Sequence, residues 1–184
     1  MTLIEMMVTM AVAGILTTAV IGFIVYTTRG FAGMMNYVEM EAQSRAALDS
    51  ILRDVRQAVA LSNAVNTSSV RSLTFGDVDS QPLTYTWSLA NRTLTRTRAD
   101  GSSTVLLSQC DNFNFSLYKR NTTNQTYNQY PTSVTNGDCK VIQITWLCSR
   151  TNTGVRQNNE CVQTAKIVMR NQQTTTTNKY GMAL

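Results

Sequence analysis

The sequence contains no histidine, only two prolines and few charged residues. Histidine is the commonest general base and the commonest zinc ligand, so its absence argues against the most frequent hydrolytic and zinc-dependent sites. Charged residues make up 15% of the chain, below the roughly 25% that is usual for a soluble domain. The phosphate-cradling, dinucleotide, zincin and hydrolase motifs are also missing. We therefore expect no catalytic residues, no metal and no cofactor, and an anchored or self-associating protein.

The lack of charge is concentrated near the N-terminus. Residues 6–28 carry no charge, and Glu5 is the only charged residue before Arg29. At about 1.5 Å per residue, a helix of this length crosses a bilayer. The segment 1–28 is therefore predicted to be a hydrophobic assembly or membrane helix.

The same helix is predicted to continue beyond residue 28, because the chain has no proline before Pro82. From residue 34 the pattern becomes amphipathic, and one stripe of apolar residues recurs at three- and four-residue steps. Its members are Leu48, Ile51, Leu52, Val55 and Val59. We expect one helix from residue 1 to about 61, roughly 90 Å long, in which residues 29–61 pack on a head.

After residue 62 the apolar pattern changes to a period of two, which indicates β-strands. Residues 62–184 should therefore form a β-rich head, and the fold class should be α+β, with the long helix packed on an antiparallel sheet. Residues 120–138 and 150–160 read as loops, and Asp100-Gly101 is a hairpin signal. The expected strands are 69–75, 83–88, 91–98, 104–108, 112–119, 140–148 and 161–169.

The net charge of +5 comes entirely from the second part of the chain: residues 1–60 sum to −1 and residues 61–184 to +6. All four cysteines also lie there, and none belongs to a C-x-x-C pair. Separated cysteines beside an apolar N-terminal segment favour an exported, oxidising location over a zinc site.

The N-terminal residues Thr2-Leu3-Ile4-Glu5, followed by Met6-Met7-Val8 and an uncharged run interrupted by Gly14, resemble the mature form of a type IV pilin or pseudopilin. The similarity covers residues 1 to about 60, although residue one is Met where the family usually has Phe. The segment from Ala46 to Ala58 resembles the minor-pilin and pseudopilin branch. The head is similar in architecture only.

The resemblance implies a structural subunit of an extracellular, type IV pilus-like filament, a helical homo-oligomer that polymerises through its N-terminal helices. In this family a basic leader is removed and the new N-terminus is methylated. By the same resemblance, the subunit is expected to wait in the inner membrane with its head outside. A prepilin peptidase, a platform protein and a cytoplasmic ATPase then act on it.

In this interpretation Glu5 directs assembly, because burial of a carboxylate in an apolar bundle costs free energy unless a cation is paired with it. A free subunit is expected to offer it no partner, whereas in a filament the methylated α-amine of Met1 on a neighbouring subunit reaches it. Thr2 is expected to add a hydroxyl. The pair would fix the register of subunits rather than add much stability. The alternative is a single-pass anchor with Glu5 at the membrane surface.

Gly14 and Gly22 bracket a segment rich in β-branched residues, and both features weaken a helix. Many pilins carry Pro at position 22 and unwind near it on assembly. We therefore expect an extended stretch within about residues 14–23 of the assembled subunit. The alternative is that both glycines permit close approach of neighbouring helices.

Four cysteines allow three connectivities. Cys148 and Cys161 flank twelve residues, which suits two neighbouring strands, and Cys110 and Cys139 flank 28. We prefer the pairs Cys110–Cys139 and Cys148–Cys161. Many pilins have a single C-terminal disulfide loop, so two pairs depart from that pattern.

Arg92, Arg96 and Arg98 are expected on one face of a strand, where they would form a weak candidate for an anion or DNA contact. Because no exposed aromatic residues are interleaved with them, a charged edge strand that resists aggregation is the competing interpretation.

Two other functions stay open from the sequence. A minor pilin or type II secretion pseudopilin would act in initiation or bind cargo, DNA or surfaces, and its low abundance in purified filaments would distinguish it. A membrane-anchored enzyme would need a deep pocket that gathers aspartates. Those aspartates, Asp77, Asp79, Asp100 and Asp111, look like turn residues.

Overall fold

The computed structural model describes residues 2–76, 81–120, 129–133, 139–151 and 158–170. In this part of the chain one long helix, α1 (Leu3–Gln57), is followed by strands only. The strands are β1 (Ala60–Asn66), β2 (Val70–Gly76), β3 (Pro82–Ser88), β4 (Thr93–Thr97), β5 (Ser103–Ser108), β6 (Cys110–Arg120), β7 (Gln129–Pro131), β8 (Val141–Thr151) and β9 (Asn158–Val168).

The strands form two antiparallel sheets. The first is a meander with the order β1-β2-β3-β4-β5, and the second has the order β7-β6-β8-β9. All their pairings are antiparallel. The predicted α+β class, a long N-terminal helix on antiparallel sheet, is confirmed, but the head has two sheets rather than one.

The helix ends at Gln57, so the expected end at about residue 61 was wrong. The Ala58 amide still donates to the Asp54 carbonyl at 2.9 Å, whereas the next amide, that of Val59, donates to Gly76 of β2. The chain thus leaves the helix where pairing with β2 becomes available. Residues 60–66 then form β1, a strand that the sequence did not indicate.

Each of the seven expected strands is present, with ends shifted by a few residues. The hairpin at Asp100-Gly101 is also confirmed: Gly101 has a φ of +81°, and the Asp100 carboxylate accepts a hydrogen bond from the Ser102 amide at 2.8 Å. A positive φ favours glycine because it has no Cβ. Residues 129–131, expected in a loop, form the short strand β7.

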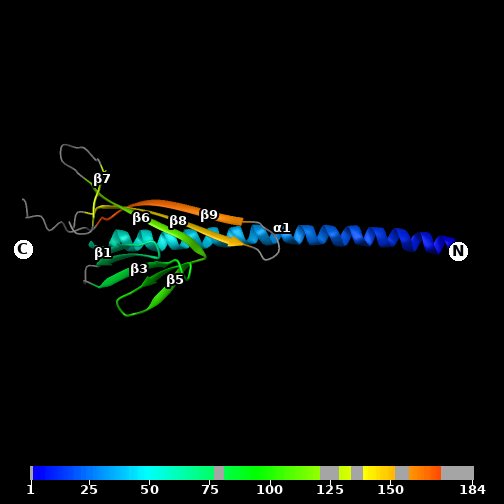
Figure 1. Cartoon of the computed structure of the whole chain (residues 1–184), viewed down its shortest axis with the longest axis horizontal. Coiled ribbons are helices and arrows are strands. Elements are labelled where there is room, and N and C mark those ends of the chain that lie inside the picture. The colour runs from blue at the N-terminus through cyan, green and yellow to red at the C-terminus, as the bar shows by residue number, and fades with distance from the viewer. Residues whose placement is uncertain (1, 77–80, 121–128, 134–138, 152–157, 171–184) are drawn as a thin grey trace, which may run out of the picture.

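The C-terminal half of α1 lies against both sheets, with contacts to β5 and β9 (Figure 1). The predicted stripe faces inward, since Ile51 and Val55 are buried and Leu48 and Leu52 pack against the core. Side-chain hydrogen bonds between the helix and the strands hold the helix in this position. The Trp146 indole donates to the Ser44 hydroxyl at 2.6 Å, and Ser108 of β5 donates to Gln43 at 3.1 Å.

Among the described residues, head contacts reach up the helix only as far as its middle. The Asn159 amide donates to the Gly33 carbonyl at 2.7 Å, and Arg150 pairs with Glu39 at 2.6 Å. Beyond this region, the N-terminal half of the helix projects away from the head, as the blue segment of Figure 1 shows. The fold therefore leaves this half of the helix without a partner among the described residues of its own chain.

Candidate functional site

The N-terminal half of α1 exposes an unusually large apolar surface. Twenty large apolar or aromatic side chains between Leu3 and Val38 are exposed, and fifteen of them precede Arg29. Soluble monomers rarely expose a contiguous apolar patch of more than a few hundred Å². The most apolar 18-residue window has a mean hydropathy of 2.3 and is 0% buried. By length and composition this helix is able to cross a membrane. The segment is therefore suited to a membrane or to other protein.

The threonine hydroxyls within this apolar half donate hydrogen bonds to backbone carbonyls of the same helix. The hydroxyl of Thr17 donates to the Ala13 carbonyl at 2.7 Å, and that of Thr18 donates to the Gly14 carbonyl at 2.8 Å. Thr9, Thr27 and Thr28 make the same kind of bond to carbonyls three or four residues earlier. Because each hydroxyl proton is already bonded, the helix can enter an apolar environment without leaving those donors unpaired.

Glu5 has a partner within its own chain, which corrects the expectation that a free subunit offers none. Its Oε2 accepts a hydrogen bond from the Thr2 backbone amide at 2.7 Å. Thr2 is the N-cap, with an extended backbone, and Glu5 is the third residue of the helix. This bond belongs to a capping box, in which an acidic side chain accepts a hydrogen bond from an otherwise unpaired amide at the helix start.

The capping bond does not occupy Glu5 completely, because a carboxylate accepts through two oxygens. A cationic group of another molecule can bind the same side chain. Met1 lies outside the described residues, so its pairing with Glu5 of a neighbour stays a prediction. Thr2 binds the Glu5 carboxylate through its backbone amide, and a role for its hydroxyl in assembly also stays a prediction.

Gly14 and Gly22 lie inside a continuous helix in the single chain. A methyl group added at either position would meet no atom within 4 Å. Packing within the subunit therefore does not require glycine there. The expected unwinding concerns the assembled subunit and stays a prediction.

Asp54 joins the helix to the first sheet and was missed by the sequence analysis. It is 8% exposed, and its carboxylate receives two contacts from Arg96 of β4, at 2.7 and 2.9 Å, and a hydrogen bond from the Tyr85 hydroxyl of β3. Burial, and then the Asp54 carboxylate, raise the pKa of Tyr85 above its ordinary value. The only signal was an acidic residue next to Val55 on the apolar stripe.

The three arginines proposed for an anion contact do not share one strand face. Arg92 precedes β4, has a φ of +51°, and pairs with Asp111 of β6. Arg96 points inward to Asp54. Two of the three guanidinium groups thus have acidic partners within the chain, and an anion or DNA contact stays a prediction.

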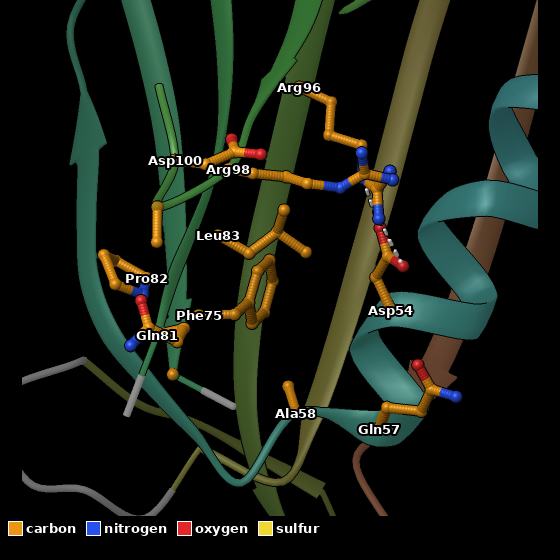
Figure 2. Close-up of a pocket in the computed structure, with 12 residues that line it drawn as sticks. Asp54, Gln57, Ala58, Phe75, Gln81, Pro82, Leu83, Arg96, Arg98 and Asp100 are labelled. Atoms are coloured by element: carbon orange, nitrogen blue, oxygen red, sulfur yellow. Dashed lines mark hydrogen bonds and ion pairs between the residues drawn. The ribbon is translucent and has the colours of Figure 1, made fainter. Parts of the chain in front are cut away.

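A pocket of about 360 Å³ lies between the C-terminal end of α1 and the first sheet. Figure 2 shows Arg96 and Arg98 extending across it toward Asp54, with Asp100 at its margin. Two arginines and two aspartates line it, so its formal charges cancel, which does not favour an anion. Asp111 does not line this pocket, and Asp77 and Asp79 lie outside the described residues. Among described residues no cluster of three or more metal-ligating side chains occurs.

All four cysteines are buried thiols in the structure. The preferred pair Cys110–Cys139 was wrong, because these residues lie near opposite ends of β6. Cys110 starts that strand, whereas Lys140, next to Cys139, donates its amide to the Tyr118 carbonyl at 2.9 Å. The eight residue steps from Cys110 to Tyr118 span roughly 25 Å. Cys148 and Cys161, the second preferred pair, are direct neighbours on β8 and β9 but are not bonded.

No protein-family model, no curated protein and no solved structure matches this chain. The functional assignment therefore depends on the geometry described above and on the resemblance of the N-terminal residues.

Proposed function

We propose that this protein is a structural subunit of a type IV pilus-like filament, which polymerises through the N-terminal half of α1. The observation that carries the proposal is the apolar window in α1 that is 0% buried and lies just after one acidic residue, Glu5. The architecture, a long apolar helix packed on antiparallel sheets, is pilin-like. Before assembly the helix would anchor the subunit in the inner membrane.

Burial of the apolar side chains supplies the driving force, because removal of each Å² of apolar surface from water contributes about 25 cal/mol. Contacts between parallel helices that are displaced along their axes are heterologous. Contacts of this kind that do not close into a ring give helical filaments. The self-bonded threonines add no unpaired donors to such a bundle.

Glu5 supplies specificity in this proposal. In a bundle of apolar helices a neighbour in the wrong register would leave a buried carboxylate without a cation, and an unpaired buried charge is strongly destabilising. The α-amine of Met1 on the adjoining subunit is the cation proposed here. In the unassembled subunit, the capping bond from the Thr2 amide holds the Glu5 side chain at the helix start.

The proposal is tested with two matched substitutions on the same helix, Ala13→Arg and Ala46→Arg. Both alanines are exposed, but Ala13 lies in the apolar half and Ala46 lies beside the head. An arginine in the centre of an apolar span costs about 3 kcal/mol. The full chain and the Ala46→Arg variant are expected to form filaments when detergent is removed, whereas the Ala13→Arg variant should stay unassembled.

Negative-stain electron microscopy and sedimentation report the outcome, and circular dichroism checks that both heads are folded. Unmodified chains that remain single copies in lipid would contradict the filament and favour the single-pass anchor. Equal assembly of both variants would show that the apolar half does not form the contact.

A further inference from the structure

Three of the four cysteines lie in one row across three neighbouring strands. In the register of the second sheet, Cys110 of β6 is opposite Cys148 of β8, and Cys148 is opposite Cys161 of β9. Residues directly opposite each other in antiparallel strands have Cα atoms about 4.5–5.5 Å apart, and disulfides span Cα distances of about 4.4–6.8 Å. Cys148 is therefore within bonding reach of both neighbours. We call these three residues the cysteine row.

The other pairings are too far apart. Cys110 and Cys161 are separated by the whole of β8, so their Cα atoms lie about 10 Å apart, beyond the limit of about 7 Å for a disulfide. Cys139 is at the far end of the sheet, where the Met169 amide donates to the Lys140 carbonyl at 3.0 Å. Cys161 of β9 is eight residue steps from Met169, which corresponds to roughly 25 Å.

The chemistry of the thiols also favours Cys148 as the reacting centre. The neighbouring Cys110 thiol lowers the pKa of Cys148, while Cys148 and burial raise the pKa of Cys110, whose thiol donates to the Asn112 carbonyl at 3.4 Å. Burial raises the pKa of Cys139 to about 11. Because the thiolate is the nucleophile in disulfide formation, Cys148 is the better attacking group of the adjoining pair, and burial disfavours the thiolate of Cys139.

We propose that the cysteine row closes a single disulfide that always contains Cys148, for which Cys110 and Cys161 compete, while Cys139 stays a thiol. The oxidant is a disulfide, either a small molecule or a disulfide oxidoreductase. A thiolate of the row attacks one oxidant sulfur and releases the other as a thiol. A second cysteine of the row then attacks the mixed disulfide, forms the internal bond and releases the second oxidant thiol.

The remaining cysteine of the row lies next to the finished bond. Its thiolate can attack the Cys148 sulfur, so that a new bond forms and the electron pair of the old bond leaves with the displaced cysteine. This exchange needs no further oxidant. The bond thus ties β8 either to β6, inside the sheet, or to the edge strand β9.

The test is a disulfide map of the full chain, refolded in detergent with a mixture of reduced and oxidised glutathione. Free thiols are alkylated with iodoacetamide, and the protein is digested and analysed by mass spectrometry. We expect two alkylated cysteines per chain, Cys139 always among them, and disulfide-linked peptides that all contain Cys148. Because the map uses the unmodified chain, it does not depend on whether a variant folds.

Single variants then test the competition within the row. Cys110→Ser should give only the Cys148–Cys161 bond, Cys161→Ser only the Cys110–Cys148 bond, and Cys148→Ser no internal bond. Cys139→Ser is the matched control and should leave the map unchanged. A bond that includes Cys139, a Cys110–Cys161 bond, two disulfides in one chain, or four alkylated cysteines in the unmodified chain would each overturn the proposal.

Discussion

At the residue scale, Glu5 combines two tasks that the structure allows to be separated. Its Oε2 caps the helix through the Thr2 amide at 2.7 Å, and its charge is proposed to bind the α-amine of a neighbouring subunit. A glutamine in its place retains an oxygen for the cap, since Glu and Gln both serve in capping boxes. The charge alone would be lost.

We therefore expect Glu5→Gln to leave the head and the helix start intact but to weaken assembly. The neighbour's ammonium would be left unpaired, which costs about 3 kcal/mol or more, and each 1.4 kcal/mol corresponds to a factor of about ten. Filament yield, measured by sedimentation, should fall by about a hundredfold. Glu41→Gln, on the head-packed part of the same helix, is the control, and equal yields for the two variants would exclude a role for the charge at position 5.

Tyr85 gives a pH-dependent prediction at the same scale. Its pKa in the folded state is raised by burial and by Asp54, so the unfolded chain loses the phenol proton first, near pH 10. The free energy of unfolding should therefore fall as the pH rises above about 10, by up to about 1.4 kcal/mol per pH unit. Urea unfolding of the full chain in detergent, at several pH values, measures this slope.

Tyr85→Phe should remove this part of the slope, because phenylalanine has no proton to lose. Tyr130→Phe serves as the control, since Tyr130 is exposed on the short strand β7. If the slope above pH 10 is the same in Tyr85→Phe as in the unmodified chain, the buried phenol is not its source.

At the element scale, the local pattern was enough to identify most of the fold. Alternation identified β3 through Leu83, Tyr85 and Trp87, of which the last two are buried. The sequence Ala60–Asn66 carries no such alternation, and it becomes β1 only because β2 offers it a partner. The end of the helix follows from the same long-range pairing, which explains why it was placed about four residues too late.

The arrangement of side chains between elements was predictable to a smaller degree. Asp54 and Arg96 are 42 residues apart, and no local signal connects them. The predicted Cys110–Cys139 pair failed for a related reason: loop lengths do not reveal that Cys110 is opposite Cys148. The sequence shows that Glu5 is the only charged residue before Arg29, but its capping bond to Thr2 was not predicted.

Gly22 gives the prediction that belongs to the helix as an element. Alanine at this position meets no clash in the single chain and should stabilise the helix by about 1 kcal/mol. If assembly requires an extended backbone near residues 14–23, Gly22→Ala should lower filament yield several-fold. Gly30→Ala is the matched control, since Gly30 has equally open surroundings outside that segment.

Density for the backbone in the assembled state would distinguish the two explanations for a Gly22→Ala defect. An extended stretch would support unwinding, and an unbroken helix with close neighbours would support close packing instead. Equal yields for Gly22→Ala and Gly30→Ala would show that neither explanation applies to this glycine.

At the scale of the whole molecule, the head has its own buried core, whereas the N-terminal half of the helix leaves its apolar side chains exposed in the single chain. Buried contacts such as Trp146 with Ser44 fix the C-terminal half of α1 to both sheets. The N-terminal half carries the exposed apolar side chains and projects from the head (Figure 1). In the proposed filament, heads at the outside and apolar helices at the centre would bury this surface.

The most direct test of this account is cryo-electron microscopy of the purified full-length protein after detergent removal. We predict fibres with a core of N-terminal helices, in which the Glu5 carboxylate of one subunit lies within about 4 Å of the Met1 α-amine of the next, the distance of an ion pair. Isolated subunits in micelles or lipid, with Glu5 facing water, would contradict it.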